Sequence, residues 1–195
     1  MNSASRISIH TCTQEDVYGF HPESDFDPRI LVDTKPIEAS EDLRFVQRNL
    51  AGSLFAGFVL EGADFSHSCL AGADFSGAVL RLADFSSANL EGAVLRLADL
   101  TFSEFVMANL SRADLRGADL CKANLRGAKL DEAKLMSADL EYASLIEADL
   151  RGADLSEADL RSARCEGALI DENTILPFGR EEAIERGMLF RGGKT

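Results

Sequence analysis

The sequence predicts an all-β fold in which the chain turns once every five residues. From Leu50 to Ile170 every fifth residue is apolar, mostly Leu and in places Phe, and we name this position the centre. The residue two before the centre is Ala in most repeats, and the residue one before it is Asp or Asn in more than half of them. In extended backbone, residues two apart point to the same side, so the small residue and the centre are expected to face inward.

Glycine marks the corners of this pattern. Every Gly between residues 48 and 170 stands two residues after a centre, where a tight turn with positive φ or little space suits it. A period of five does not fit an α-helix, because five steps rotate by about 500° and the centres would spiral around it. It does not fit a straight strand either, because an odd period alternates between the two faces.

The repeat A(D/N)Lxx, clear in the stretch SRADLRGADLCKANLRGAKL, resembles the consensus of the pentapeptide-repeat proteins. The resemblance covers about residues 48–170. It implies a right-handed quadrilateral β-solenoid, the pentapeptide-repeat β-helix, with four repeats per coil and a continuous core of stacked centres. About six coils at about 4.8 Å each would give a rod roughly 30 Å long.

The chain divides into three expected segments. Residues 48–170 form the solenoid. Residues 1–47 contain no repeat and are expected to form either a cap with short strands or an arm. Residues 171–195 are expected to cap the open strand edges with a short helix over residues 181–186. We expect this helix to act as a cap alone; the alternative, implied by the resemblance, is that it also forms a homodimer.

The Phe centres assign the core of the N-terminal half. Phe65, Phe85 and Phe105 are 20 residues apart and should stack on one wall of a 20-residue coil. Phe55 and Phe75 should then stack on the opposite wall.

Charge and hydropathy exclude some partners. The 195 residues include 33 acidic and 20 basic side chains, a formal net charge of -13. Direct binding to nucleic acid is not expected, because phosphate binding needs a surplus of Lys and Arg on one face. The first ten residues hold no apolar run of signal-peptide length, and no stretch approaches the roughly 20 apolar residues of a membrane span. We therefore expect a cytoplasmic protein without a membrane partner.

Catalytic chemistry is not indicated. The sequence has no GxGxxG, Walker or GxSxG pattern. His10, Cys12 and His21 could join Asp25 or Asp27 at a metal, but their spacing matches no recognised zinc site. We expect no catalytic residue, no metal site, no cofactor and no enzymatic activity.

The outward positions that break the polar pattern are the best candidates for binding a partner. We expect side chains from adjacent coils to form one exposed apolar patch, whose members are Leu82, Leu97, Phe102, Val106 and Met107. Tyr142 stands at the same position of the coil as Leu82 and Phe102, two coils after Phe102. Such patches often mark interaction sites. The alternatives are that the N-terminal segment covers the patch, or that corner side chains simply pack on one another.

A row of carboxylates on the wall of Phe102 is the second candidate feature: Asp99, Asp119, Asp139 and Asp159. Asp at this position can accept hydrogen bonds from nearby backbone amides, which is a structural explanation. The functional alternative comes from the resemblance, because quinolone-resistance members and their mycobacterial relative mimic DNA and occupy the DNA site of gyrase. The mixed charges of the repeats, including Arg96 and Arg116 on one wall, weaken this alternative.

We therefore expect a non-enzymatic protein-binding scaffold or regulator, which presents a rigid solenoid surface to a protein partner. The alternative is a DNA-mimic inhibitor or protector of DNA gyrase or another topoisomerase.

Overall fold

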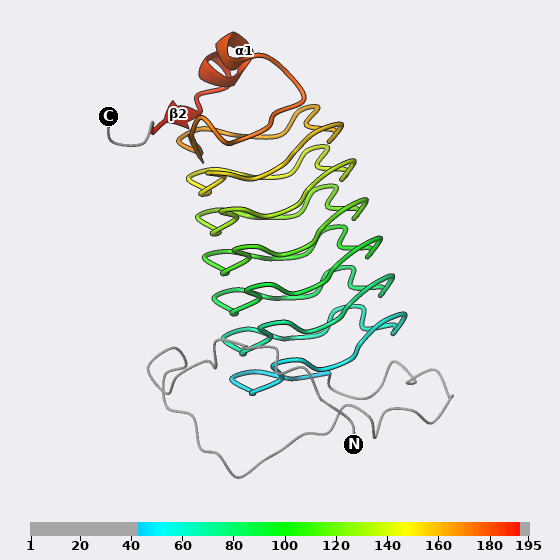
Figure 1. Cartoon of the computed structure of the whole chain (residues 1–195). Coiled ribbons are helices and arrows are strands. Elements are labelled where there is room, and N and C mark those ends of the chain that lie inside the picture. The colour runs from blue at the N-terminus through cyan, green and yellow to red at the C-terminus, as the bar shows by residue number, and fades with distance from the viewer. Residues whose placement is uncertain (1–42, 192–195) are drawn as a thin grey trace, which may run out of the picture.

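The computed structural model describes residues 43–191, which form a rod of stacked coils (Figure 1). Parallel bridges join each residue before a centre to the residue 20 positions later, from Arg44↔Asp64 to Asp149↔Leu169. Each coil therefore contains four repeats, and the expected solenoid is confirmed.

The corners share one backbone conformation. Every fifth residue from Gln47 to Gly167 has a positive φ, between 55° and 75°. The centre carbonyl accepts a hydrogen bond from the N–H three residues later, as from Ala83 to Leu80 at 3.1 Å. This closes a β-turn whose third residue is left-handed, the geometry for which Gly is favoured. Non-glycine residues occupy more than half of these corners.

The four walls of the rod are named here by their centres, which recur every 20 residues. Wall 1 carries the centres from 45 to 165, wall 2 those from 50 to 170, wall 3 those from 55 to 155, and wall 4 those from 60 to 160. A corner takes the numbers of the two walls that it joins.

The core is built from the stacked centres with Ala beside them, and nearly all of these side chains are fully buried. On wall 1 the rings of Phe65 and Phe85 stack with centroids 5.1 Å apart, and Phe105 continues the stack 4.9 Å beyond. On wall 3, Phe55 and Phe75 stack at 4.8 Å. The expected two Phe stacks on opposing walls are therefore present, and they meet edge to face across the core.

Coil pairing begins before the boundary expected at residue 48. Arg44 bridges to Asp64, and the buried ring of Phe45 stacks on Phe65 at 4.7 Å. The rest of the N-terminal segment, residues 1–42, lies outside the described residues.

The C-terminal end closes the rod with a strand, a helix and a second strand: β1 (Leu169–Ile170), α1 (Arg180–Glu185) and β2 (Leu189–Phe190). β2 pairs in parallel with β1 and continues the stacking by one more layer. Ala183 of α1 and Met188 are buried against the last coil. The expected helical cap is present, shifted by one residue at each end.

The solenoid also runs past the boundary expected at residue 170. Ile175 bridges to Asp154, a spacing of 21 residues instead of 20. Asp171 fastens the one-residue insertion, because its Oδ1 accepts hydrogen bonds at 3.0 Å from the N–H groups of Gly152, Asn173 and Thr174. Burial alone would raise the pKa of Asp171, but these hydrogen bonds, together with one from the Thr174 hydroxyl, outweigh it and lower the pKa.

Candidate functional site

The Asp and Asn residues before the centres serve the backbone. Each of them places Oδ1 2.8 to 3.4 Å from the backbone N–H of the residue after the centre. This N–H would otherwise lack an acceptor at the corner, because the ladder between coils does not use it. The acidic column of the repeat is thus a structural feature on all four walls.

The carboxylates of wall 4 follow the same rule. Asp99, Asp119, Asp139 and Asp159 are successive bridge partners along the rod. Asp119 accepts from the N–H of Cys121 at 3.0 Å, and Asp139 from that of Glu141 at 2.9 Å. The structural explanation of this row is therefore sufficient, although each carboxylate keeps oxygen lone pairs for a further partner.

Arginines neutralise several of these carboxylates on other walls and at the C-terminal end of wall 4. Arg116 donates from Nε and Nη2 to Asp114 at 2.8 and 2.6 Å, and Arg151 pairs with Asp149 in the same way at 2.8 and 2.5 Å. These hydrogen bonds lower the pKa of Asp114 and of Asp149. Arg161 likewise lowers the pKa of Asp159 on wall 4. The surface is a mixture of both charges rather than a uniform negative face.

Five large apolar side chains stand at left-handed corners and are exposed: Leu82 at 58%, Leu97 at 71%, Phe102 at 45%, Met107 at 65% and Tyr142 at 55%. A left-handed backbone costs a non-glycine residue about 1 kcal/mol or more. The closed coil imposes this conformation on every corner, whatever residue stands there.

These residues do not form the single patch expected from the sequence. Leu97, Phe102 and Met107 occupy three successive corners, 3/4, 4/1 and 1/2, so Leu97 and Met107 lie on diagonally opposite edges of the rod. Half-buried Val106 precedes Met107 on the wall 1 side. Each corner turns the chain onto a new wall, which is why neighbours in sequence separate in space.

Wall 4 brings together a different set. Leu82 and Phe102 are stacked in one column at corner 4/1, and Leu97 flanks the opposite edge of the same wall. Between these edges, Val59 and Val79 take the position that Asp99 and Asp119 hold in later coils; Val59 is 60% exposed. The two valines were missed from the sequence, although their place in the Asp column was a readable signal.

Corner side chains lean over the corner of the next coil. A Cβ on Gly117 would meet Cδ2 of Leu97 at 2.9 Å, and a Cβ on Gly127 would meet Sδ of Met107 at 2.6 Å. The ammonium of Lys122 lies 4.9 Å from the ring centroid of Phe102, a cation–π geometry. Phe102 is therefore partly covered by Lys122 and still exposed.

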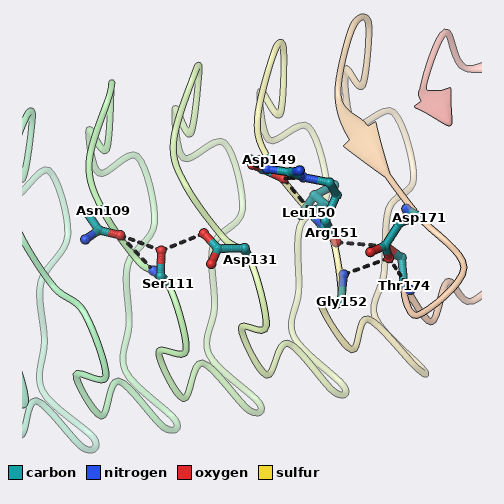
Figure 2. A network of polar contacts seen from close by, with 9 residues as sticks. All are labelled: Asn109, Ser111, Asp131, Asp149, Leu150, Arg151, Gly152, Asp171 and Thr174. Atoms are coloured by element: carbon teal, nitrogen blue, oxygen red, sulfur yellow. Dashed lines mark hydrogen bonds and ion pairs between the residues drawn. The ribbon is translucent and has the colours of Figure 1, made fainter. Parts of the chain in front are cut away.

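A hollow lined by polar and charged side chains lies on wall 2. It measures about 560 Å³, and Asp131, Asp149, Arg151 and Asp171 line it. Figure 2 shows Ser111 between Asn109 and Asp131, with Oγ 2.6 Å from an oxygen of each. Asp149 is paired with Arg151 and Asp171 accepts hydrogen bonds from the backbone, while Lys129 and Glu132 also line the hollow.

Within residues 43–191, no group of three or more His, Cys, Asp or Glu side chains is placed to hold a metal ion. No helix in that part of the chain is long and apolar enough to span a membrane. The candidate metal residues of the N-terminal segment lie outside the described residues.

The family model for pentapeptide repeats matches residues 49–81, 80–117, 103–141 and 138–171. This chain belongs to the pentapeptide-repeat family. A comparison with the curated proteins finds no match.

Solved structures of other members are similar to this chain. HetL, a pentapeptide-repeat protein involved in heterocyst differentiation regulation from the cyanobacterium Nostoc sp. strain PCC 7120, is 32% identical, with 67% of this chain and 72% of HetL covered and a TM-score of 0.43. Rfr23 from the cyanobacterium Cyanothece 51142 is 28% identical, with 69% and 91% covered and a TM-score of 0.26. QnrB1, a plasmid-mediated fluoroquinolone resistance protein, is 21% identical, with 76% and 89% covered and a TM-score of 0.36.

Proposed function

We propose that this chain is a non-enzymatic protein-binding scaffold or regulator, and that it binds its partner through wall 4. One observation supports this most strongly: Leu82, Leu97 and Phe102 expose large apolar side chains from left-handed corners around the same wall. The coil geometry explains the backbone conformation, which every corner shares, but it does not explain why large apolar side chains are exposed there; a role in recognition explains that exposure best.

A rigid rod suits this role. The core is filled by close-packed centres, and the walls are held by hydrogen bonds between coils, such as Leu100 N–H to Asp119 C=O at 2.7 Å. A surface that does not rearrange loses little conformational entropy on binding. The 32% identical HetL is described as involved in regulation, which favours a regulator over a purely architectural protein.

Copurification with matched variants tests the proposal. Phe102→Asp places a charge in the apolar part of wall 4, while Ser162→Asp places the same charge in the same corner column three coils away. We expect the wild type and Ser162→Asp to recover a partner from the source cells that Phe102→Asp does not recover. Equal recovery of every protein by all three would reject wall 4 as the binding surface.

A DNA mimic that inhibits or protects gyrase is the second candidate. It is favoured by Asp99, Asp119 and Asp139, which form a carboxylate row on wall 4 for which no ion pair is recorded within residues 43–191. A supercoiling assay with purified gyrase would support it if inhibition disappeared in Asp119→Lys/Asp139→Lys. Supercoiling that is unaffected by the wild-type protein would reject it.

A homodimer through the C-terminal helix also belongs to the proposal. Ile184 on α1 is 57% exposed and Leu189 on β2 is 47% exposed, so the cap presents apolar side chains at the end of the rod. A second copy is the occupant that the family resemblance suggests for this end.

A further inference from the structure

Wall 4 changes character along the rod. In the first coils its outward positions hold Val59, Val79 and Leu82, with Phe102 in the same corner column as Leu82. From Asp119 onward the wall and its two corners carry five carboxylates and two cations. The carboxylates are Asp119, Asp139, Glu141, Glu157 and Asp159, and the cations are Lys122 and Arg161. The N-terminal part therefore exposes large apolar side chains among a balanced set of charges, and the C-terminal part is net acidic. The charges of the N-terminal part are Glu61, Arg81, Arg96, Asp99 and Arg116.

The acidic part keeps an excess of negative charge after its internal pairs are counted. Arg161 bonds both Asp159 and Glu141, with its Nη2 2.8 and 3.3 Å from a carboxylate oxygen of each. Lys122 is directed to the ring of Phe102. Asp119 and Asp139 are half-buried, and among residues 43–191 each bonds a backbone N–H while no ion pair with a cation is recorded for it. These two carboxylates are therefore already held in place for a cationic group of a partner.

The side of the rod offers side chains rather than strand edges. The strand hydrogen bonds run between coils along the rod axis, as from Leu80 N–H to Asp99 C=O at 2.7 Å and from Leu120 N–H to Asp139 C=O at 2.7 Å. An added β-strand, which binds through a free edge, has no place on this wall. A partner segment must therefore satisfy its own backbone, as an α-helix does.

The spacing of the coils also favours a helix. Two coils advance by about 9.6 Å along the rod, and seven residues of α-helix advance by about 10.5 Å. One helix face can thus repeat its contacts on every second coil of wall 4. Same-face residues of an extended strand are about 6.7 Å apart and would lose register after one coil.

We infer that wall 4 binds an amphipathic α-helix of a partner protein lying along the rod axis, with apolar residues over Val79, Leu82 and Phe102 and Lys or Arg residues over Asp119 and Asp139. This inference rests on the proposed function and specifies the partner. About 20 residues of helix, roughly 30 Å, would cover both parts of the wall.

A synthetic peptide tests it with the full chain. The probe is an Ala-rich helix of about 20 residues with a stripe of Leu at positions i, i+3, i+4 and i+7 in one half and Lys at the equivalent positions in the other half. The control peptide has the same composition with Leu and Lys interleaved along the stripe. Amide chemical shifts of the ¹⁵N-labelled protein report where each peptide binds.

We expect the probe to shift amides of wall 4 and its two corners, and the control peptide to bind more weakly. Asp119→Asn/Asp139→Asn should weaken binding about fivefold and reduce its dependence on salt. Asn keeps the hydrogen bond to the corner N–H, as the repeat already does at Asn109, so the fold is retained. The control pair Asp74→Asn/Asp154→Asn removes the same charge from wall 3 and should leave the affinity unchanged.

Four results would overturn the inference: shifts on another wall, equal binding of the two peptides, equal effects of the two Asn pairs, or no shift up to about 1 mM peptide. Shifts of wall 4 that grow with protein concentration alone would assign the wall to a second copy instead. If copurification depends on Phe102 while the peptide fails, the helix is wrong and the scaffold stands. If copurification does not depend on Phe102, the proposed function itself fails.

Discussion

The N-terminal and C-terminal halves of the rod differ both in the residues of the core and in the residues on the surface of wall 4. Up to Phe105 the core of walls 1 and 3 is filled mainly with stacked phenyl rings, and wall 4 begins with Val59 and Val79. From Leu115 onward the core is mainly Leu and the outward column of wall 4 is Asp. Inward and outward positions alternate along each strand, so the two changes are independent substitutions in one unchanged backbone.

This difference teaches that stability and recognition are separable in this fold. Core residues such as Phe85 are fully buried and determine how strongly coils hold together. Corner residues such as Leu97 add nothing to the core, and their backbone conformation costs free energy. Substitutions at the two kinds of position should therefore have distinct signatures.

Core substitutions should have the largest effect on the free energy of unfolding. They should also show which half of the rod is stabilised more by its core side chains. Phe85→Ala removes an inner ring of the wall 1 stack and should lower the free energy of unfolding by about 4 kcal/mol. Leu145→Ala on the same wall in the C-terminal half should cost about 3 kcal/mol, because a smaller side chain leaves. Urea unfolding followed by circular dichroism measures both. A larger loss for Leu145→Ala would show that the Phe stacks do not dominate the stability of the N-terminal half.

Substitutions at the corners should have the second-largest effect on stability. They separate the cost of the left-handed backbone from the cost of a side-chain clash. Gly77 and Gly117 share corner 3/4, but a Cβ on Gly77 would meet nothing within 4 Å, while one on Gly117 would meet Leu97. Both Gly→Ala changes should cost about 1 kcal/mol through the left-handed backbone. Gly117→Ala should cost a few tenths more, and Leu97→Ala should abolish that excess. Equal unfolding midpoints for the two single variants would mean that the leaning side chain yields freely.

Acid should weaken the C-terminal half slightly more than the N-terminal half. The pKa of Asp149 is lowered by Arg151, and the pKa of Asp114 by Arg116. A lowered folded-state pKa stabilises the protein above the unfolded pKa, about 3.9, and this contribution is lost as the pH falls through the folded value. Because both pairs lie at the surface, solvent screens them and each should contribute little.

Arg151→Met checks this pH dependence. In this variant the free energy of unfolding should fall less between pH 5 and about pH 2 than it does in the wild type. At neutral pH the variant should lose little more than the contribution of the missing ion pair. An unchanged slope in the variant would reject Arg151 as the cause.

The cap should show the smallest effect on stability. Ile184→Glu changes an exposed side chain of α1 and should alter the free energy of unfolding by no more than about 0.5 kcal/mol. If the chain dimerises through this helix, light scattering should show a dimer for the wild type and a monomer for Ile184→Glu. The same mass for both proteins would exclude Ile184 from any such interface.

The interior of the rod was predictable because one rule covers it. Once every fifth residue is a centre, the stacking of Phe65, Phe85 and Phe105 follows from their spacing alone. The corners were predictable only in part. Gly indicated where φ is positive, but Leu82 and Tyr142 adopt the same conformation although their side chains disfavour it, because the coil geometry overrides local preference.

The ends and the surface were predicted less well. The coil through Ile175 was missed because a one-residue insertion at Asp171 breaks the period that revealed the others. The apolar patch was drawn too wide because Leu97, Phe102 and Met107 are close in sequence, whereas each corner between them turns the chain onto another wall. On this solenoid, residues 20 apart in the sequence are neighbours on one wall, whereas residues five apart lie on different walls.

Photocrosslinking along one corner column tests the central assignment most directly. A photoreactive amino acid is placed in turn at positions 82, 102, 122, 142 and 162, which all lie at corner 4/1 with the same backbone conformation. If wall 4 binds a protein through its apolar N-terminal part, one partner should crosslink strongly from 82 and 102 and weakly or not at all from 162. Equal crosslinking at all five positions, or none above background, would contradict the assignment of wall 4 as the recognition surface.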